Sequence, residues 1–285
     1  MNYSLQEPVM ADLHCHTQIS DGRLTPQEVV VLAARKGLSV MAITDHDSAS
    51  GVAAAEREGA GRGIEVIPGI EFNTDWQGTE VHILGYGIDA TAQMLRQQLA
   101  QLQAYRKERA AKILEKLRVS GIFLSFQQLS ANVPGETFGR PHIARTLVQY
   151  GYVSDEAEAF RCYLRKGAPA YIPGYKITSS EGIRLIRQIG GVPVLAHPGK
   201  EDYSQVLPEW IANGLQGIEV VHPDHDARDE GFWLSTAQRY RLLISGGSDF
   251  HGPDNIHGAD LGSKGVSLAV VSALKDQALR NQKEG

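Results

Sequence analysis

Residues 10–16 of the chain read MADLHCH, and residues 39–47 read SVMAITDHD. Each stretch begins as a short apolar segment of the kind that forms a buried strand. Each then passes directly into histidine and aspartate. Ionisable side chains are costly to bury without partners, so their position at the end of a strand indicates a functional site there.

The same arrangement recurs along the chain. Apolar segments also lead into Glu71, His197, His222 and Asp249, and one further segment carries His82 within it. Short apolar runs bounded by turn residues are typical of buried strands. We therefore expect strands at residues 10–13, 39–44, 64–67, 81–84, 192–196, 217–221 and 242–245.

Helical segments separate most of these strands. They are expected at residues 26–36, 48–59 and 180–189, the first with Thr25 as N-cap and Pro26 as the first helical residue. Strands that alternate with helices predict an α/β fold with a mostly parallel sheet. A barrel of this kind collects its functional groups at the C-terminal ends of its strands. About seven strand ends here carry His, Asp or Glu, so we predict a barrel.

The middle of the chain interrupts this alternation. Residues 92–119 follow a long helical pattern, with apolar positions that include Leu95, Leu99 and Leu102. Helical or loop character, rich in Arg, Lys and Tyr, continues to about residue 166. We predict that residues 9–91 and 169–285 build the barrel. Residues 92–168 would form a mainly helical insertion that recognises the substrate.

Histidines and carboxylates provide the main chemical signal. His14 and His16 lie two apart on a strand end, so both rings point to one side as a pair of metal ligands. Further metal-competent side chains follow at the other strand ends. A metal cluster would supply the partners that such buried charges need. The predicted ligands are His14, His16, Asp21, His46, Glu71, His82, His197, Asp249 and His251.

Composition limits the remaining possibilities. The 285 residues carry a net charge of −5, which gives no general basic surface for duplex nucleic acid. The two cysteines, Cys15 and Cys162, have no CxxC spacing, which fits a reducing compartment and excludes a thiolate zinc framework. We find neither a signal peptide nor an apolar run long enough to span a bilayer. We therefore expect a cytoplasmic protein without a membrane partner.

These motifs resemble those of the PHP (polymerase and histidinol phosphatase) family, phosphoesterases on a distorted (β/α)7 barrel. The similarity rests on stretches from residue 12 to residue 251, in family order. The amidohydrolase superfamily also opens with HxH on a first strand. Its bridging lysine and spaced His pair on middle strands are not found here. The matching stretches are Asp12–Thr17 with Ser20–Gly22, Thr44–His46, Gly69–Glu71, His82, Ala196–Gly199 and Gly247–His251.

The resemblance implies three divalent metals. One would be bound by His14, His16, Glu71 and Asp249; a second by Glu71, His82 and His197; a third by Asp21, His46 and His251. Some family members have His in place of Asp21, which leaves the preference of the third site open. Imidazole and carboxylate ligands suit Mn²⁺, Fe²⁺ or Zn²⁺, and the resemblance favours Mn²⁺.

Within the family, the chain is most similar to the 3′,5′-nucleotide bisphosphatases and the related 5′-to-3′ exoribonucleases of short RNAs. The supporting stretches are Gly139–Arg145 and Gly217–Pro223. The resemblance implies hydrolysis of the 3′-phosphate of a nucleoside 3′,5′-bisphosphate such as pAp, giving AMP and phosphate. It leaves open exonuclease action on short oligoribonucleotides.

Other residues are candidates for the remaining roles. His222 or His225 could protonate the leaving oxygen or bind a phosphate, although each could equally be a surface histidine. Basic side chains could hold the non-reacting phosphate, or could simply face solvent on helices. These are Arg140, Arg145, Arg106, Arg109 and Lys176.

Two alternative functions stay open. One is a phosphomonoesterase of the histidinol-phosphate type, which would need an acidic pocket for the amine of its substrate. The other is a non-catalytic PHP module that binds nucleic acid or a polymerase, which loss of ligand residues would mark. The sequence leaves the oligomeric state open.

Overall fold

The computed structural model describes residues 10–133, 137–199, 201–253 and 259–284. Within these residues, eight strands form one sheet, in which seven follow the order β1-β2-β3-β4-β6-β7-β8 and β5 pairs with β3. The strands are β1 (Ala11–Asp12), β2 (Val40–Ile43), β3 (Glu65–Trp76), β4 (Thr79–Tyr86), β5 (Ile177–Thr178), β6 (Val192–Leu195), β7 (Gly217–Val221) and β8 (Leu243–Gly246).

The sheet curls until its two edge strands meet. The N–H of Leu13, just after β1, donates to the carbonyl of Gly246 at the end of β8 over 3.2 Å. The N–H of His16 donates to the carbonyl of Phe250 over 2.8 Å, and Cys15 and Phe250 form a parallel bridge. The seven strands therefore form a nearly closed barrel, which confirms the predicted fold class. Closure also brings the residues after β1 next to those after β8.

The third and fourth strands differ from the prediction. The sequence predicted a strand over 64–67 that ends before Glu71, but β3 continues to Trp76 and the chain returns directly as β4. Gln77 and Gly78 form the turn with φ values of 52° and 82°, as a two-residue hairpin requires. Strand β4 is antiparallel to both β3 and β6, whereas β1-β2, β2-β3, β6-β7 and β7-β8 are parallel. Glu71 and His82 therefore lie inside a hairpin.

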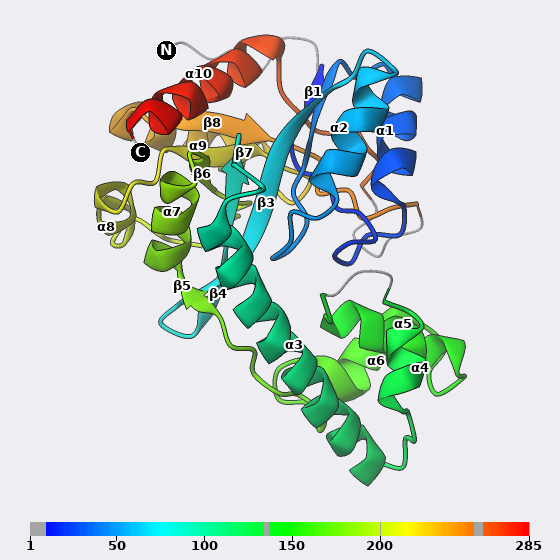
Figure 1. Ribbon diagram of the computed structural model, residues 1–285. Helices are drawn as coiled ribbons and strands as arrows, with labels where there is room; N and C mark the ends of the chain where they lie inside the picture. Colours follow the sequence, from blue (N-terminus) through cyan, green and yellow to red (C-terminus); the bar gives the residue numbers. More distant parts are fainter. Residues whose placement is uncertain (1–9, 134–136, 200, 254–258, 285) are drawn as a thin grey trace.

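Helices cover the outside of the barrel, with α1 and α2 on one side and α7 and α8 on the other (Figure 1). The predicted start of the first helix is confirmed. The Thr25 hydroxyl accepts from the N–H of Glu28, and the Glu28 carboxylate accepts from the N–H of Thr25. These helices are α1 (Pro26–Arg35), α2 (Val52–Ala60), α7 (Ser179–Gln188), α8 (Leu207–Ala212), α9 (Ala227–Tyr240) and α10 (Leu268–Glu284).

The long helix α3 connects the barrel to a smaller helical lobe (Figure 1). Leu95 and Leu99, in its first half, belong to the barrel core, whereas Ile113 and Leu117 belong to a second hydrophobic cluster within the lobe. One helix thus packs into both cores. The helices from 93 to 164 are α3 (Gln93–Val119), α4 (Phe126–Ser130), α5 (Arg140–Gln149), α6 (Glu156–Ala159) and the π-helix η1 (Phe160–Leu164).

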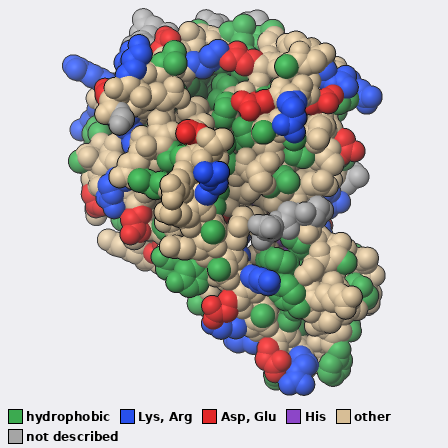
Figure 2. Space-filling view, in the orientation of Figure 1, with side chains coloured by type: hydrophobic (Ala, Val, Ile, Leu, Met, Phe, Trp, Pro, Cys, Tyr) green, Lys and Arg blue, Asp and Glu red, His purple; other side chains and the backbone are tan. Residues whose placement is uncertain are grey.

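The surface carries charges of both signs. On the face in Figure 2, Lys and Arg side chains are interspersed with Asp and Glu and form no continuous patch of one sign. Among the helices that the structure describes, none has the length and apolar character needed to cross a membrane. The cytoplasmic location expected from the sequence stays a prediction.

Candidate metal centre and adjoining pocket

The nine predicted ligands come together at one end of the barrel. Each belongs to at least one group of side chains whose ligand atoms lie within 4.8 Å of one another. His14 and His16 follow β1, Asp21 lies in the next turn, His46 follows β2, Glu71 and His82 lie in the β3–β4 hairpin, His197 follows β6, and Asp249 and His251 follow β8.

Glu71 occupies the middle of this cluster and is fully buried. Its Oε1 lies 2.9 Å from His82 Nδ1 and 3.1 Å from His197 Nε2. Its Oε2 lies 3.3 Å from His14 Nε2, 3.2 Å from His16 Nε2 and 3.0 Å from His46 Nδ1. The two oxygens of one carboxylate therefore face two different sets of histidines, which is the geometry that a bridging ligand needs.

A further set of ligand atoms surrounds Asp21. Its Oδ1 lies 3.3 Å from His251 Nε2 and 4.0 Å from His16 Nδ1. The rings of His16 and His251 are stacked with centroids 4.0 Å apart, and His46 belongs to the same group. His16 thus stands between this set and the one around Glu71.

The centre has the properties of a site for divalent ions. Among the described residues, six of its buried atoms lack a hydrogen-bond partner, and each such atom normally costs about 1–3 kcal/mol. Nitrogen–oxygen separations of 3.0–3.3 Å match ligand atoms that share one ion, because bonds of about 2.1 Å at right angles place neighbours about 3 Å apart. The six atoms are His14 Nε2, His16 Nε2, Asp21 Oδ1, His46 Nδ1, Glu71 Oε2 and His222 Nε2.

Carboxylates outside the cluster orient its histidines. Glu219 Oε1 lies 2.9 Å from His14 Nδ1, and its Oε2 accepts from the backbone N–H of His197 over 2.7 Å. Glu80 Oε1 lies 3.2 Å from His82 Nε2. In both rings, the nitrogen not directed at Glu71 meets a carboxylate. This second contact fixes the ring and its tautomer, as is usual for metal-binding histidines.

The charges at the centre stabilise one another. Burial opposes ionisation of Glu71, but the positive charges of His46, His14 and His82 hold its pKa well below the ordinary value. Burial also opposes protonation of His82, yet Glu71 and Glu80 raise the pKa of that ring to about 10. Metal ions bind the neutral ring and would take the place of these protons.

Two candidate ligands sit on strained backbone. Asp249 has a φ of 50° and His197 a φ of 21°, in the left-handed region that residues other than glycine rarely adopt. Such conformations cost about 1–3 kcal/mol each and persist where the surroundings hold them. Close packing fixes the chain beside Asp249, since a Cβ on Gly247 would lie 2.4 Å from the backbone nitrogen of His14. Packing of the loop against β1 therefore holds Asp249 in this conformation, with its side chain in the cluster.

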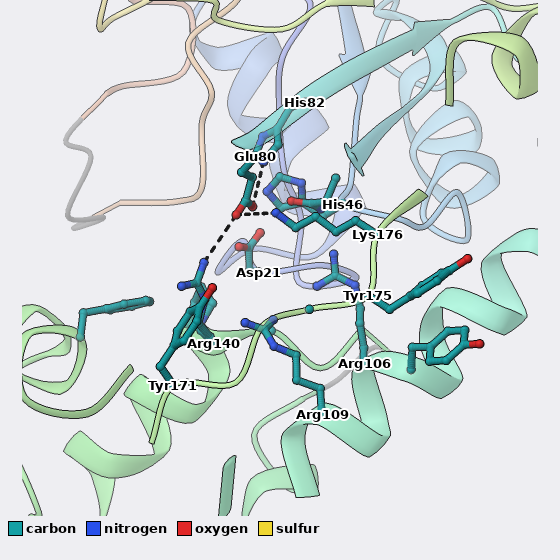
Figure 3. Close-up of a pocket in the computed structure, with 16 residues that line it drawn as sticks. Asp21, His46, Glu80, His82, Arg106, Arg109, Arg140, Tyr171, Tyr175 and Lys176 are labelled. Carbon is teal, nitrogen blue, oxygen red and sulfur yellow. Dashed lines mark hydrogen bonds and ion pairs between the residues drawn. The ribbon is translucent and has the colours of Figure 1, made fainter. Parts of the chain in front are cut away.

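A pocket of about 200 Å³ opens beside the metal centre, between the barrel and the insertion. Asp21, His46 and His82 line its inner end. Its outer walls are basic and aromatic, and come from α3, the start of α5, the start of η1 and residues 171–176 (Figure 3). These wall residues are Arg106, Arg109, Arg140, Lys176, Tyr105, Phe160, Tyr171 and Tyr175.

One carboxylate links the pocket to the metal centre. Glu80 Oε2 lies 2.6 Å from Lys176 Nζ and 3.9 Å from an Arg140 nitrogen, while Oε1 contacts His82 (Figure 3). These contacts with His82 and Lys176 hold the pKa of Glu80 below its usual value despite burial. Burial, with the charges of Arg140 and Arg106, lowers the pKa of Arg109 to about 10. The pocket thus carries excess positive charge that Glu80 only partly balances.

Comparison with known proteins agrees with this site. The family model described as the PHP domain matches residues 12–160. The chain belongs to the PHP family. A 3′,5′-nucleoside bisphosphate phosphatase of Chromobacterium violaceum is 38% identical, over 88% of this chain and 90% of its own. The 5′-3′ exoribonuclease Rnm of Escherichia coli is 35% identical, over 86% of each.

A solved structure agrees as well. A proposed metal-dependent phosphoesterase from Bifidobacterium adolescentis superposes with a TM-score of 0.87 at 31% identity, over 95% of this chain and 98% of that one. Together with the sequence relatives, it confirms the predicted PHP barrel. This PHP protein is a phosphoesterase of that metal-dependent family.

The two histidines after β7 have different surroundings. His222 is buried, and its Nε2 lies 3.6 Å from Asp249 Oδ2, facing the metal centre. His225 has Nδ1 2.8 Å from the carbonyl of Val220, and its Nε2 accepts from the N–H of Gly199 over 2.9 Å. Backbone groups thus hold both His225 nitrogens. The ring therefore supports the backbone at this end of the barrel, and the catalytic role expected of His225 from the sequence stays a prediction.

The side chains predicted to bind phosphate lie in two different places. Arg109, Arg140 and Lys176 line the pocket, and so does Arg106, which is paired with Asp47. Arg145 is not among the lining residues; it donates to the carbonyl of Asp21 and lies 3.5 Å from Glu156. It therefore ties α5 to the turn that carries Asp21. A direct contact with substrate, as the sequence suggested, has no support from this position.

Several residues of the site were not singled out by the sequence. Glu219 lies in a buried apolar strand, and that unusual position was a signal for a role. Asp12 accepts from both the N–H and the hydroxyl of Ser248, and Asp45 binds Thr17 and Ser20. Both aspartates are fully buried and hold the loops on which the ligands sit. Glu80 gave no signal, because it lies at an exposed hairpin end.

Proposed function

We propose that this PHP protein removes the 3′-phosphate of nucleoside 3′,5′-bisphosphates, such as pAp, and that it does so with three divalent metals. The observation that carries the proposal is the basic pocket beside the metal centre. A monophosphate needs only the centre, whereas a second phosphate needs its own cations at a fixed distance from the first.

The pocket and the centre share residues, so substrate binding and chemistry would take place side by side. His46 and His82 belong to the metal-ligand groups and also line the pocket. The reacting phosphate would lie against the centre, and the second phosphate would lie against Arg109, Arg140 and Lys176. Arginine suits this task because its guanidinium presents several donors to phosphate oxygens.

The position of Glu80 supports the phosphate assignment. Its carboxylate is an anion held by Lys176 and near Arg140, so these cations already bind negative charge. A phosphate offers more acceptor oxygens than a carboxylate and would compete for the same donors. The Arg140 guanidinium lies 5.9 Å from the ring centroids of both Phe160 and Tyr171, which hold it in place.

Three ions would be bound as the family resemblance implies, with Glu71 bridging two of them and Asp21, His46 and His251 holding the third. Such ions supply Lewis acidity, which neutralises charge on the reacting phosphate and lowers the pKa of water. Mn²⁺ is proposed first, and Fe²⁺ or Zn²⁺ would also suit this donor set. His222 Nε2 has no hydrogen-bond partner and faces the centre beside Asp249, and it would hold the proton that the leaving oxygen needs.

The same pocket bears on the other candidate functions. A histidinol-phosphate-type substrate carries an amine, which three pocket cations would repel. A non-catalytic module would not need nine ligand residues brought together around unpaired buried atoms. Exonuclease action on short oligoribonucleotides would use the same metal centre and basic pocket. In a 5′-phosphorylated oligonucleotide, the first internal phosphate is esterified to the 3′-oxygen of a nucleoside that also carries a 5′-phosphate. We therefore propose it as a second activity.

A pair of matched variants tests the proposal. Arg140→Ala should lower kcat/KM for adenosine 3′,5′-bisphosphate by about 10- to 150-fold, the value of one lost charge-assisted phosphate contact. Hydrolysis of a small monophosphate ester should stay near the wild-type rate. Arg187→Ala is the control, because the Arg187 side chain is equally exposed (26% against 27%) but pairs with Glu284 on the barrel.

The control variant should hydrolyse both substrates with the wild-type kcat/KM. A melting curve checks that each variant folds. An equal loss on both substrates with Arg140→Ala would remove this arginine from the substrate site. A wild-type enzyme without activity on any nucleoside bisphosphate would contradict the proposed function itself.

A further inference from the structure

Two exposed tyrosines stack on each other at the rim of the pocket. Tyr105 comes from α3, and Tyr175 comes from the segment between η1 and β5. Their ring centroids are 4.2 Å apart and the planes are inclined by 26°. Both line the pocket, yet 44% of Tyr105 and 53% of Tyr175 remain exposed. Each ring covers one face of the other and leaves a second face available.

Core packing does not account for this pair. Neither tyrosine belongs to the barrel cluster or to the lobe cluster. An exposed aromatic pair next to charged groups is typical of a surface that binds another ring, because aromatic side chains offer a large rigid area at low entropic cost. The neighbours in sequence, Arg106 and Lys176, line the same pocket, so the pair is part of it.

The other aromatic rings of the pocket are already engaged. Phe160 and Tyr171 each face the guanidinium of Arg140. The stacked tyrosines are therefore the aromatic surface that is left for a ligand. In Figure 3, Lys176 points toward Glu80, whereas Tyr175 points to the other side of the same segment. The cations and the tyrosines thus lie on two different sides of the pocket. A nucleotide likewise carries its 5′-phosphate and its base at two different positions of the ribose.

We propose that Tyr105 and Tyr175 form the nucleobase site of this enzyme, with the base stacked on the free face of the pair. This inference rests on the proposed function for the phosphate end of the ligand. Stacking uses the π-face that every base has, so the site would accept purines and pyrimidines alike. It would favour nucleotides over sugar phosphates that lack a base, and on an oligonucleotide it would hold the 5′-terminal base.

Binding of two simple ligands separates the base from the phosphate. Adenosine 5′-monophosphate and ribose 5-phosphate carry the same phosphate group, and only the first carries a base. Calorimetric titration of each into manganese-loaded protein should give tighter binding of the nucleotide. The double variant Tyr105→Ala/Tyr175→Ala should bind the nucleotide about 5- to 150-fold more weakly, the range for one stacked base. Its affinity for ribose 5-phosphate should not change.

Two further variants serve as controls. Tyr105→Phe/Tyr175→Phe keeps the rings and removes the hydroxyls, so it should bind the nucleotide nearly as the wild type does. Tyr150→Ala removes a tyrosine of the insertion that is as exposed as Tyr105 (44%) but does not line the pocket, and should change neither ligand. If the double alanine variant does not fold, Tyr175→Ala alone carries the comparison, since Tyr175 lies outside any helix.

Failure of this inference is distinct from failure of the proposed function. A double alanine variant that still prefers adenosine 5′-monophosphate over ribose 5-phosphate to the wild-type extent overturns the base site, whatever the enzyme hydrolyses. A wild-type protein that binds both ligands equally also overturns it. If the preference depends on the tyrosines while no nucleoside bisphosphate is hydrolysed, the base site stands and the proposed reaction fails.

Discussion

The metal centre and the adjoining pocket are built in different ways, although they share an edge. The candidate ligands lie on strands or in the loops that follow them, and hydrogen bonds to the carboxylates of Asp12, Asp45 and Glu219 hold these loops and rings. The pocket walls are long side chains on helices and on a connecting segment. Its charges meet at a half-exposed carboxylate, Glu80.

This difference separates chemistry from recognition. On the proposed function, the centre would bind the metals and the reacting phosphate, whereas the pocket of arginine, lysine and tyrosine would select the group attached to that phosphate. Substitutions at the centre should therefore affect all substrates, and substitutions in the pocket should affect only substrates that reach it.

Glu71→Ala should have the largest effect. Both carboxylate oxygens face histidines of the centre, so its loss should remove more than one equivalent of metal and lower turnover by orders of magnitude on every substrate. Elemental analysis after reconstitution with Mn²⁺ measures the first effect, and wild-type protein treated in parallel is the reference. Full metal content in the variant would rule out the bridging role.

The two histidines after β7 should respond in opposite ways. His222→Ala should lower kcat by about 10²- to 10⁴-fold with little change in melting temperature, the range for loss of a general acid. His225→Ala instead leaves the N–H of Gly199 and the carbonyl of Val220 unpaired, and should cost about 2–4 kcal/mol of unfolding free energy. Denaturant unfolding and turnover are measured on both. A large kcat loss in a fully stable His225 variant would reverse this assignment.

Glu219→Gln should have an intermediate effect. The carboxylate contacts His14 Nδ1 and the backbone of His197 but does not belong to the group around Glu71. Loss of such an orienting group typically costs 10- to 100-fold in metal affinity or activity. Titration with Mn²⁺ should show weaker metal binding in the variant. Turnover of a bisphosphate and of a monophosphate should fall by the same factor. Unchanged metal affinity would mean that Glu219 has no part in orienting the ligands.

Lys176→Ala should have the smallest effect, and only in the pocket. The ion pair with Glu80 partly neutralises Lys176. We therefore expect the variant to lose about 1–1.5 kcal/mol of transition-state stabilisation, or about 5- to 13-fold in kcat/KM, for a nucleoside bisphosphate. A small phosphate ester should be hydrolysed as before. Lys112→Ala, which removes an exposed pair with Glu108, is the control. A loss on both substrates would place Lys176 in the chemistry instead of recognition.

The sequence predicted the metal centre better than the pocket, for a physical reason. Strand ends fix the direction of a side chain within one or two residues, so His14, His16 and His46 could be placed from local pattern alone. The β3–β4 hairpin escaped prediction because Asn73, Thr74 and Asp75 make the second half of β3 polar. Glu71 and His82 were nevertheless identified, because each lies at the end of or within a short apolar segment, and the family motifs include both.

Long-range contacts explain what the sequence could not give. His222 and His225 follow the same strand, and contacts with distant segments distinguish them: Asp249 lies beside His222, and the N–H of Gly199 donates to His225. Arg106 and Arg109 lie one helical turn apart on α3, but Asp47 of the barrel pairs with the first. Arg145 was expected at the substrate and instead holds the Asp21 turn. Partners from distant segments determine the role of each long side chain.

The product formed from adenosine 3′,5′-bisphosphate shows which of the two phosphates lies at the metal centre during the reaction. Phosphorus NMR of the wild-type reaction with Mn²⁺ distinguishes the two possible monophosphates. If Arg109, Arg140 and Lys176 hold the 5′-phosphate, the products should be adenosine 5′-monophosphate and one equivalent of inorganic phosphate. Adenosine 3′-monophosphate as the product, or no hydrolysis at all, would contradict the proposed function.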